Sequence, residues 1–225
     1  MRPLFFCLFA MICFPPLMAG GVTVSEVKPN QQATAQTHIS ANKLRALLIH
    51  LDSLDTRFEQ TVYSFEGDVL QQTSGHLTAA RPGKVRWETN PPIEQLVVSD
   101  GETLWIYDPD LEQVSIRPFN QDLSKTPAVL FIGDLETLES SYDISHEPGD
   151  AANTAKYTLT PIDAHSLYEK VSLGFINKTP SSMTLWDSLG QKTEIIFNGQ
   201  QLNQTLDLKL FHFAPPEGVD ILRDE

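Results

Sequence analysis

Hydrophobic residues near the start of the chain recur with the period of an α-helix. From Ser40 onward, leucines stand three or four positions apart, at Leu44, Leu47, Leu48, Leu51 and Leu54. This spacing places one apolar stripe along a helix of about four turns. We therefore predict a helix that covers an apolar surface, and from the pattern alone an ordinary core helix is the favoured interpretation.

After Asp55 the period falls to two. Short alternating segments follow, bounded by Gly, Asp and Pro: first "RFEQTVYS", "TSGHLTAA", "KVRWE", "EQLVVSDGETLWIYDP" and "EQVSIRPF", later "KYTLTP", "EKVSLGFIN", "SMTLWD", "QKTEIIF" and "DLKLFHF". This pattern is typical of consecutive antiparallel strands, and Asp100–Gly101 is the strongest hairpin signal among them. About ten strands in one continuous meander predict a barrel or a strongly curved sheet, and argue against a two-layer α/β fold.

A different segment, "SKTPAVLFIGDLETLESS", separates the two sets of strands. Thr126 suits an N-cap and Pro127 the first helical position, so a helix is expected to begin there. Gly133 divides the segment into two short helices, of which the first is apolar nearly all round. A helix of this kind, inserted midway through a β meander, is well placed to plug or cap a barrel.

Strand alternation also predicts which side chains share a face. Leu77, Ala79, Arg81, Val85 and Trp87 fall on one face, and Arg81 is the cation of this otherwise apolar set. Three further apolar faces are expected, at Val171, Leu173 and Phe175, at Ile195 and Phe197, and at Phe211 and Phe213. These side chains either fill a core or line a cavity, and the pattern alone favours a filled core because protein interiors pack densely.

The first twenty residues have the layout of a secretory signal peptide. Arg2 precedes an apolar run, Pro15–Pro16 interrupt it, and Ala19 offers a small residue for cleavage. We expect a signal peptide at 1–20, a flexible leader at 21–37 and one domain at 38–225. Both cysteines lie in the signal, and Gly20–Gly21 stand where a bacterial lipoprotein needs a cysteine, so the exported product should be soluble and unlipidated.

Net charge narrows the range of partners. The formal net charge is -13, with 16 basic and 29 acidic side chains, and removal of Arg2 with the signal leaves 15 against 29, or -14. Nucleic acids and anionic membrane surfaces are polyanions, so neither is expected as a general partner. A basic partner protein stays possible. An equally good explanation of the negative charge is that it merely keeps an exported protein soluble.

Candidate catalytic chemistry is sparse. The six histidines are scattered without metal-binding spacing, and the sequence contains no G-x-S-x-G elbow, no P-loop and no G-x-G-x-x-G. A pair of carboxylates brought together by folding stays open, as in many hydrolases. We nevertheless predict a protein that is not an enzyme and that uses neither a metal ion nor a cofactor.

Several stretches together resemble one known family. They are "FEQTV" (58–62), "RPGKVRWE" (81–88), "EQLVVSDGETLWIYDPDLEQV" (94–114), "TPAVLF" (126–131), "LTP" (159–161), "DSLGQKTEIIF" (187–197) and "FHFAPPEGVD" (211–220). In this order they resemble the periplasmic outer-membrane lipoprotein carriers of Gram-negative bacteria, the LolA family. The pattern SDG-x-x-LW-x-YDP-x-LEQ followed by TPA is specific enough to make chance similarity an unsatisfactory explanation.

The resemblance implies a mainly β fold, an incomplete antiparallel β-barrel covered by a lid of short α-helices around a hydrophobic cavity. It therefore favours a cavity over a filled core. It also implies a soluble periplasmic chaperone, expected to be monomeric, whose cargo is acylated lipoproteins. An ATP-driven inner-membrane release complex would supply this cargo, and an outer-membrane lipoprotein receptor would accept it.

The resemblance also implies roles for individual residues. Arg81 is expected to latch the empty, closed state by donating hydrogen bonds to lid carbonyls. The lid is assigned to Leu44, Leu47, Leu51, Val129, Leu130 and Ile132, and the acyl-chain cavity to Val85, Trp87, Leu104, Ile106, Phe175 and Phe213. Two rivals stay open: an exported lipid-binding sensor or regulator on the same half-barrel, and, after it, an enzyme with a carboxylate pair in the cavity.

Overall fold

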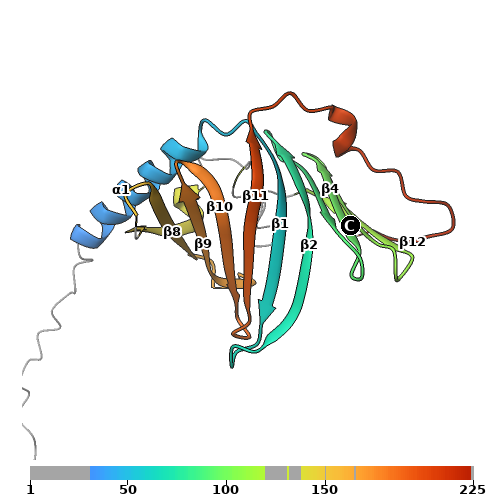
Figure 1. Ribbon diagram of the computed structural model, residues 1–225, viewed down its shortest axis with the longest axis horizontal. Helices are drawn as coiled ribbons and strands as arrows, with labels where there is room; N and C mark the ends of the chain where they lie inside the picture. The colour runs from blue at the N-terminus through green and yellow to red at the C-terminus, as the bar shows by residue number, and fades with distance from the viewer. Residues whose placement is uncertain (1–30, 120–130, 132–137, 150, 165, 224–225) are drawn as a thin grey trace, which may run out of the picture.

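The described strands form a single open β-sheet, curved around one side (Figure 1). The computed structural model describes residues 31–119, 131, 138–149, 151–164 and 166–223. Twelve strands follow the order β12-β6-β5-β4-β3-β2-β1-β11-β10-β9-β8-β7, with β12 and β7 at the two ends. The predicted antiparallel, mainly β architecture is therefore present as an open twelve-stranded sheet.

Two runs of neighbouring strands make up this sheet. The first contains β1 (Ser53–Tyr63), β2 (Val69–Ala80), β3 (Lys84–Thr89), β4 (Gln95–Asp100), β5 (Thr103–Asp108) and β6 (Gln113–Pro118). The second contains β7 (Tyr142–Pro148), β8 (Thr154–Pro161), β9 (Tyr168–Ile176), β10 (Thr179–Asp187) and β11 (Lys192–Leu202). Within each run every strand pairs antiparallel with the next, and the hairpin predicted at Asp100–Gly101 joins β4 to β5.

The prediction of one continuous meander was wrong at the junction of the two runs. The sheet is joined by β1 and β11, which pair antiparallel although they lie at opposite ends of the sequence. The last strand, β12 (Asp220–Arg223), then pairs parallel with β6 and extends the other end of the sheet. Alternation predicts strands and their faces, but it contains no information about which distant strand completes a pair.

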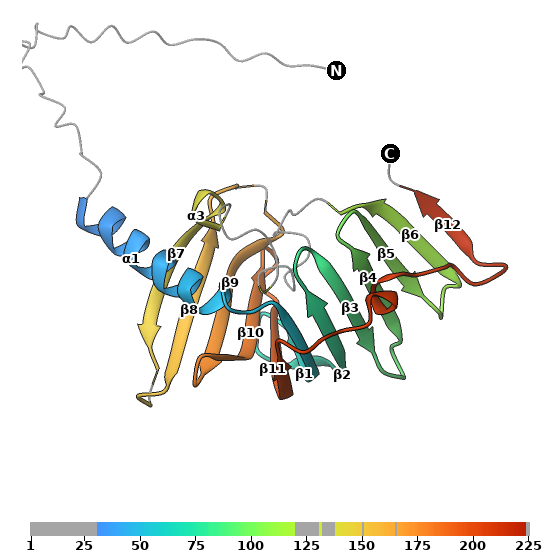
Figure 2. The same ribbon diagram turned by 90° about the horizontal axis from the view of Figure 1, so that it is seen from above.

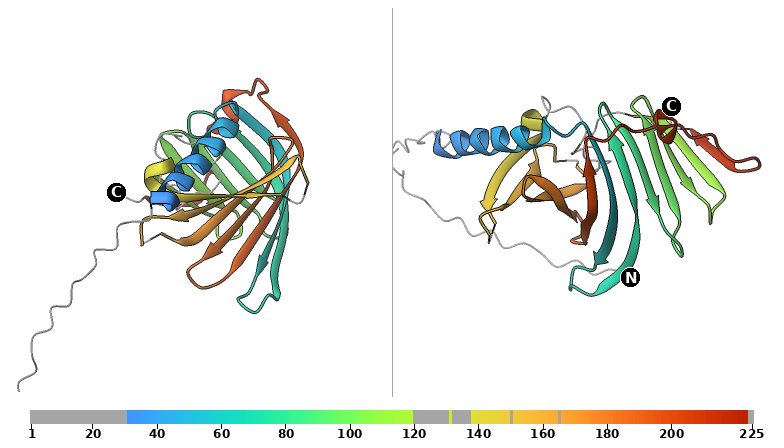
Figure 3. Two further views of the ribbon diagram at one scale, coloured as in Figure 1. Left: turned by 90° about the vertical axis from the view of Figure 1, so that its left-hand side faces the viewer. Right: turned by 45° about the horizontal axis from the view of Figure 1, so that its top comes forward.

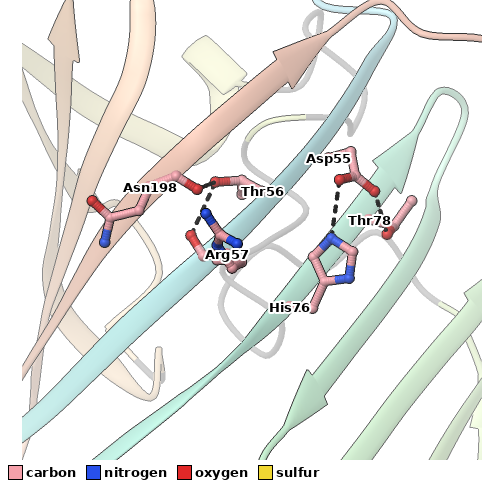
Figure 4. Close-up of polar contacts among 6 residues, drawn as sticks. All are labelled: Asp55, Thr56, Arg57, His76, Thr78 and Asn198. Carbon is pink, nitrogen blue, oxygen red and sulfur yellow. Dashed lines mark hydrogen bonds and ion pairs between the residues drawn. The ribbon is translucent and has the colours of Figure 1, made fainter.

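The central strand β1 bends where its pairing with β11 shifts register, between Asp55 and Arg57. At this bulge the buried Thr56 hydroxyl lies 3.2 Å from the backbone carbonyl of Asn198 and 3.0 Å from that of Arg57 (Figure 4). On the outer face beside it, the Asp55 carboxylate lies 3.0 Å from His76 Nε2 and accepts a hydrogen bond of 3.0 Å from Thr78. Bulges increase local twist, so this irregularity of the β1–β11 pair contributes to the curvature of the sheet.

The long helix α1 (Gln31–Leu48) crosses the inner face of the sheet over β7, β8 and β9 (Figure 2). It begins earlier than predicted, so residues 31–37 of the expected flexible leader are helical. It also ends earlier: the chain turns after Leu48, and Leu54 belongs to β1. A one-turn helix, α3 (Leu138–Ser141), follows within the segment for which short helices were predicted, while Thr126 and Pro127 lie outside the described residues.

Hydrophobic side chains cluster on both faces of the sheet. The main core lies on the inner face, where Leu44 and Leu48 of α1 pack with buried side chains of both runs, Phe58, Leu173 and Phe197 among them. A smaller cluster on the outer face surrounds Val98, Trp105 and Val114, beneath the 3₁₀ helix η1 (Leu208–Phe211) and the chain that leads to β12. Figure 3 shows the sheet curving around the side that carries α1.

Candidate functional site

A cavity of about 360 Å³ opens on the inner face, where the two runs of strands curve toward each other. Its lining is mainly apolar and comes from both runs: Val85, Trp87, Val97, Leu104, Ile106, Met183, Leu185 and Ile195. The Trp87 ring is packed against Phe58, with ring centroids 4.2 Å apart. Protein pockets for small molecules typically measure about 300–1,000 Å³ and are lined in this way, so the cavity is a candidate binding site.

Polar side chains also line the cavity, and none of those that the structure describes is a carboxylate. They are Gln60, Gln95, Arg117, Tyr168 and Thr193. Burial raises the pKa of the Tyr168 phenol above its ordinary value of 10.0, and the negative charge of Asp187 raises it further. Tyr168 is therefore neutral at physiological pH, and among the described lining residues Arg117 is the one cation. Such a surface can bind and orient a ligand that has both apolar and polar parts.

Arg81 lies at the end of β2, where three segments of the chain meet. Its Nε donates a hydrogen bond of 2.9 Å to the carbonyl of Leu51, and its Nη2 donates bonds of 3.1 Å to the carbonyls of Leu48 and Phe131. The last carbonyls of an α-helix have no partners within the helix, and a guanidinium has five N–H donors to offer them. Arg81 thus ties β2 to the end of α1 and to Phe131.

The turn between α1 and β1 is held from its other side by Asn203. The Asn203 side-chain oxygen accepts a hydrogen bond of 2.8 Å from the backbone N–H of Asp52, and its amide nitrogen donates one of 2.9 Å to the carbonyl of His50. The backbone N–H of Asn203 also donates to the carbonyl of Ser53, at 2.9 Å. Arg81 and Asn203 together fix the position of the C-terminal end of α1.

The lid leucines that the resemblance implies all face the core. Leu44 and Leu51 are buried, and Leu47 packs against the same cluster while remaining partly exposed. Phe131 is also buried, with its ring 5.6 Å from that of Phe197. Val129, Leu130 and Ile132, the other predicted lid residues, lie outside the described residues.

Four of the six predicted cavity residues line the cavity: Val85, Trp87, Leu104 and Ile106. Phe175 is buried instead in the core, 5.8 Å from the ring of Tyr157, beside a separate hollow that also contacts Leu47. Phe213 was placed on the wrong face. Its ring packs 5.7 Å from that of Tyr107 in the outer cluster, because the chain at 208–213 is a 3₁₀ helix and loop in which strand parity does not apply.

Sequence reasoning missed Arg117, although Arg117 is a lining residue of the cavity. In β6 the apolar residues Val114 and Ile116 face the outer cluster, so the usual assumption that the apolar face is the inner face inverts this strand. The register provides the correct signal, because Arg117 stands directly opposite Leu104 of β5. Directly opposed residues share a face, so Arg117 lies on the same side as Leu104.

Known proteins of one family are similar to this chain over most of its length. The sequence profile of the outer membrane lipoprotein carrier protein LolA matches residues 50–214. The chain is 41% identical to the outer-membrane lipoprotein carrier protein of Hahella chejuensis over 181 residues, covering 80% of this chain and 87% of that protein. It is 40% identical to the protein of the same description from Azotobacter vinelandii over 185 residues, covering 82% and 88%.

A solved structure of a LolA superfamily protein from Nitrosomonas europaea is also similar, with 15% identity and a TM-score of 0.45, covering 77% of this chain and 98% of that one. No helix in the described part of the chain combines the length and the apolarity needed to cross a bilayer. The profile spans most of the chain, and the relatives share two fifths of its residues along most of their own length. The chain therefore belongs to the outer-membrane lipoprotein carrier family, LolA.

Proposed function

We propose that this protein is a periplasmic carrier that shields the acyl chains of lipoproteins in the inner-face cavity. It accepts acylated lipoproteins from an ATP-driven inner-membrane release complex and delivers them to an outer-membrane lipoprotein receptor. The observation that supports this most directly is the apolar cavity between the two runs of strands, in a chain that belongs to a family of lipoprotein carriers. Membership in that family also agrees with the prediction that the protein is not an enzyme.

Exposing acyl chains to water has a large free-energy cost, which a carrier avoids. Each buried methylene is worth about 0.8 kcal/mol, so three acyl chains of roughly fifteen methylenes each would cost on the order of 35 kcal/mol to expose fully to water. Lipoproteins therefore do not cross an aqueous compartment unassisted. The carrier must shield the chains and also surrender them, which requires a cavity with a movable cover.

Cavity size supports a moving cover. A volume of about 360 Å³ stands at the lower end of the range for drug-sized ligands, and three acyl chains are larger than such ligands. Loading therefore requires the elements around the cavity to separate. We infer that the part that moves is α1, with Leu44 and Leu47, together with the turn that follows it, with Leu51, and that the hydrogen bonds of Arg81 hold the empty protein closed.

The experiment that tests the function is a release assay. Protein purified from a periplasmic extract is added to spheroplasts that carry newly made lipoproteins, and the soluble fraction is examined for lipoprotein bound to the carrier. Ile106→Asp places a charge in the cavity lining and should abolish release. Ile196→Asp, at a side chain that is 47% exposed on the outer face, is the matched control and should release as the wild type does.

The outcomes separate the candidate functions. Release by the wild type and by Ile196→Asp, with none by Ile106→Asp, supports a carrier that uses this cavity. Acyl-chain binding in solution without release would contradict the carrier function and point to a lipid-binding sensor. Absence of both would show that the cavity does not hold acyl chains.

A further inference from the structure

Arg117 is placed in the cavity by the geometry of β6. It stands opposite Leu104 in the register with β5, and both side chains line the cavity. The neighbouring Ile116 faces the outer cluster, as alternation requires. A strand of the sheet therefore holds the guanidinium on the inner face, in the wall that also contains Val85 and Ile106.

The Arg117 guanidinium has no partner in the described part of the chain. Its Nε atom is buried and its N–H donates to no described acceptor, and no ion pair joins the guanidinium to a described carboxylate. Among the described side chains that line the cavity there is no Asp or Glu. Arg81 provides the contrast within the same molecule, because its guanidinium donates to three backbone carbonyls.

An unpartnered buried donor indicates an acceptor that arrives with the ligand. Arginine carries five N–H donors and no acceptor. Buried donors nearly always have a hydrogen-bond acceptor, because a buried donor without one costs free energy. Methylene groups offer no acceptor, so acyl chains alone would leave Arg117 as it is. The oxygen atoms of acylated cargo are concentrated where the chains join the head, in ester and amide carbonyls.

We propose that Arg117 recognises the carbonyl oxygens at the head of the acyl chains, so that the cavity selects ester-linked chains and not hydrocarbon in general. This inference rests on the proposed carrier function and adds to it a residue that determines specificity. The head then lies against the Leu104–Arg117 part of the wall, and the chains extend across Trp87 and Ile106 toward Met183 of the second run.

The test compares two probes of equal chain length by calorimetric titration of the periplasmic protein. 1,2-Dioctanoylglycerol has two ester carbonyls, and 1,2-dioctylglycerol replaces each carbonyl with a methylene in an ether linkage. The wild type should bind the ester about tenfold more tightly than the ether, the size expected for a hydrogen bond to a charged donor. Arg117→Met should bind both probes equally, with an ether affinity close to that of the wild type.

Two further variants control for charge and for folding. Arg57→Met removes the same charge from an exposed position of β1 and should keep the tenfold preference. Arg117→Lys keeps a cation but lacks the buried Nε donor, so it should retain only part of the preference. Thermal unfolding followed by circular dichroism establishes that each variant is folded, and Arg117→Lys carries the test should Arg117→Met fail to fold.

The outcomes distinguish this inference from the function on which it rests. An ester preference that persists in Arg117→Met, while the ether still binds, would overturn the role of Arg117 and leave the acyl-chain cavity standing. Binding of octanoate that depends on Arg117, without any ester preference, would replace head-group recognition with a carboxylate site. Failure of the wild type to bind either glycerol probe would contradict the carrier function itself.

Discussion

At the residue scale, Arg81 and Arg117 are two guanidinium groups on one inner face with opposite hydrogen-bonding states. Arg81 is bonded to backbone carbonyls from the end of α1, from the following turn and from Phe131. Arg117 has a buried nitrogen without a partner in the described residues. The first arrangement holds three segments of the chain together, and the second leaves a donor that a ligand can use.

Replacing Arg81 by Leu should shift the protein toward the open state. If Arg81 is the latch that we propose, the empty closed form of the variant loses these hydrogen bonds while the loaded form loses none, so cargo should be retained about tenfold more strongly and delivered less readily. The free energy of unfolding should fall by no more than about 2 kcal/mol. Transfer from loaded carrier to receptor-bearing membranes measures the effect.

Arg86→Leu is the matched control for that experiment. Arg86 reaches a single backbone carbonyl, that of Leu210 at 3.4 Å, and otherwise pairs with Glu88 on the outer side of β3. Transfer by this variant should equal that of the wild type. Unchanged transfer in both variants would show that Arg81 is not a latch.

Tyr168 makes stability depend on alkaline pH. Burial, and then the charge of Asp187, raise the pKa of its phenol in the folded state above 10.0, so the folded protein holds this proton more tightly than the unfolded chain. The stabilising contribution is therefore complete below pH 10 and is lost as the pH rises through the folded pKa. Denaturant unfolding at pH 8 and pH 11 should show a smaller loss of stability for Tyr168→Phe than for the wild type. An equal loss in the two proteins would contradict this assignment.

At the scale of elements, Gly75 of β2 makes room for the aromatic pair beneath the cavity. It stands opposite Phe58 of β1, and a Cβ at this position would collide with the Phe58 ring and with the backbone oxygen of Glu88. The Phe58 ring in turn stacks on Trp87, which lines the cavity. A missing side chain in one strand thus permits the packing of its two neighbours.

Gly75→Ala should lower the free energy of unfolding by about 2 kcal/mol, the usual cost of forcing extra volume into a packed core. The displaced Phe58 ring should also alter the fluorescence of Trp87. Gln72→Ala, at an exposed position of the same strand, should change neither quantity. Denaturant unfolding monitored by fluorescence measures both, and an unperturbed Gly75→Ala variant would show that the ring has room to move.

The limits of sequence reasoning also follow from particular elements. Alternation correctly predicted the buried faces of Val171, Leu173 and Phe175 in β9 and of Ile195 and Phe197 in β11. It failed for the ends of α1, because the polar residues before Ser40 show no apolar stripe, and because Leu51 and Leu54 continue the helical spacing into a turn and a strand.

The polar residues of the cavity could not be predicted from the sequence for a related reason. Gln60, Tyr168 and Arg117 reach the cavity from three strands that come together only through the pairing of β1 with β11 and the curvature of the sheet. Local patterns do not encode such proximity. In β6 the local pattern even points the wrong way, because its apolar residues Val114 and Ile116 face the outer cluster while Arg117 lines the cavity.

At the scale of the whole molecule, the cavity is a joint product of the two runs of strands. Its walls include Leu104 and Ile106 from the first run and Met183 and Ile195 from the second. Neither run alone encloses the space. Binding therefore depends on the β1–β11 pair as much as on any residue that contacts the ligand.

That pairing also governs when the protein can fold. The hydrogen bond between Thr56 and Asn198 joins positions 142 residues apart, so the central pair cannot form until β11 is available. A chain ending at residue 190 should show no cooperative thermal transition, while one ending at 216, which lacks only β12 and its approach, should retain it. Contacts of such high sequence separation slow folding to milliseconds or longer. A chain that crossed a membrane N-terminus first would therefore have no cavity until almost all of it had emerged, and it could take up no lipid while it crossed.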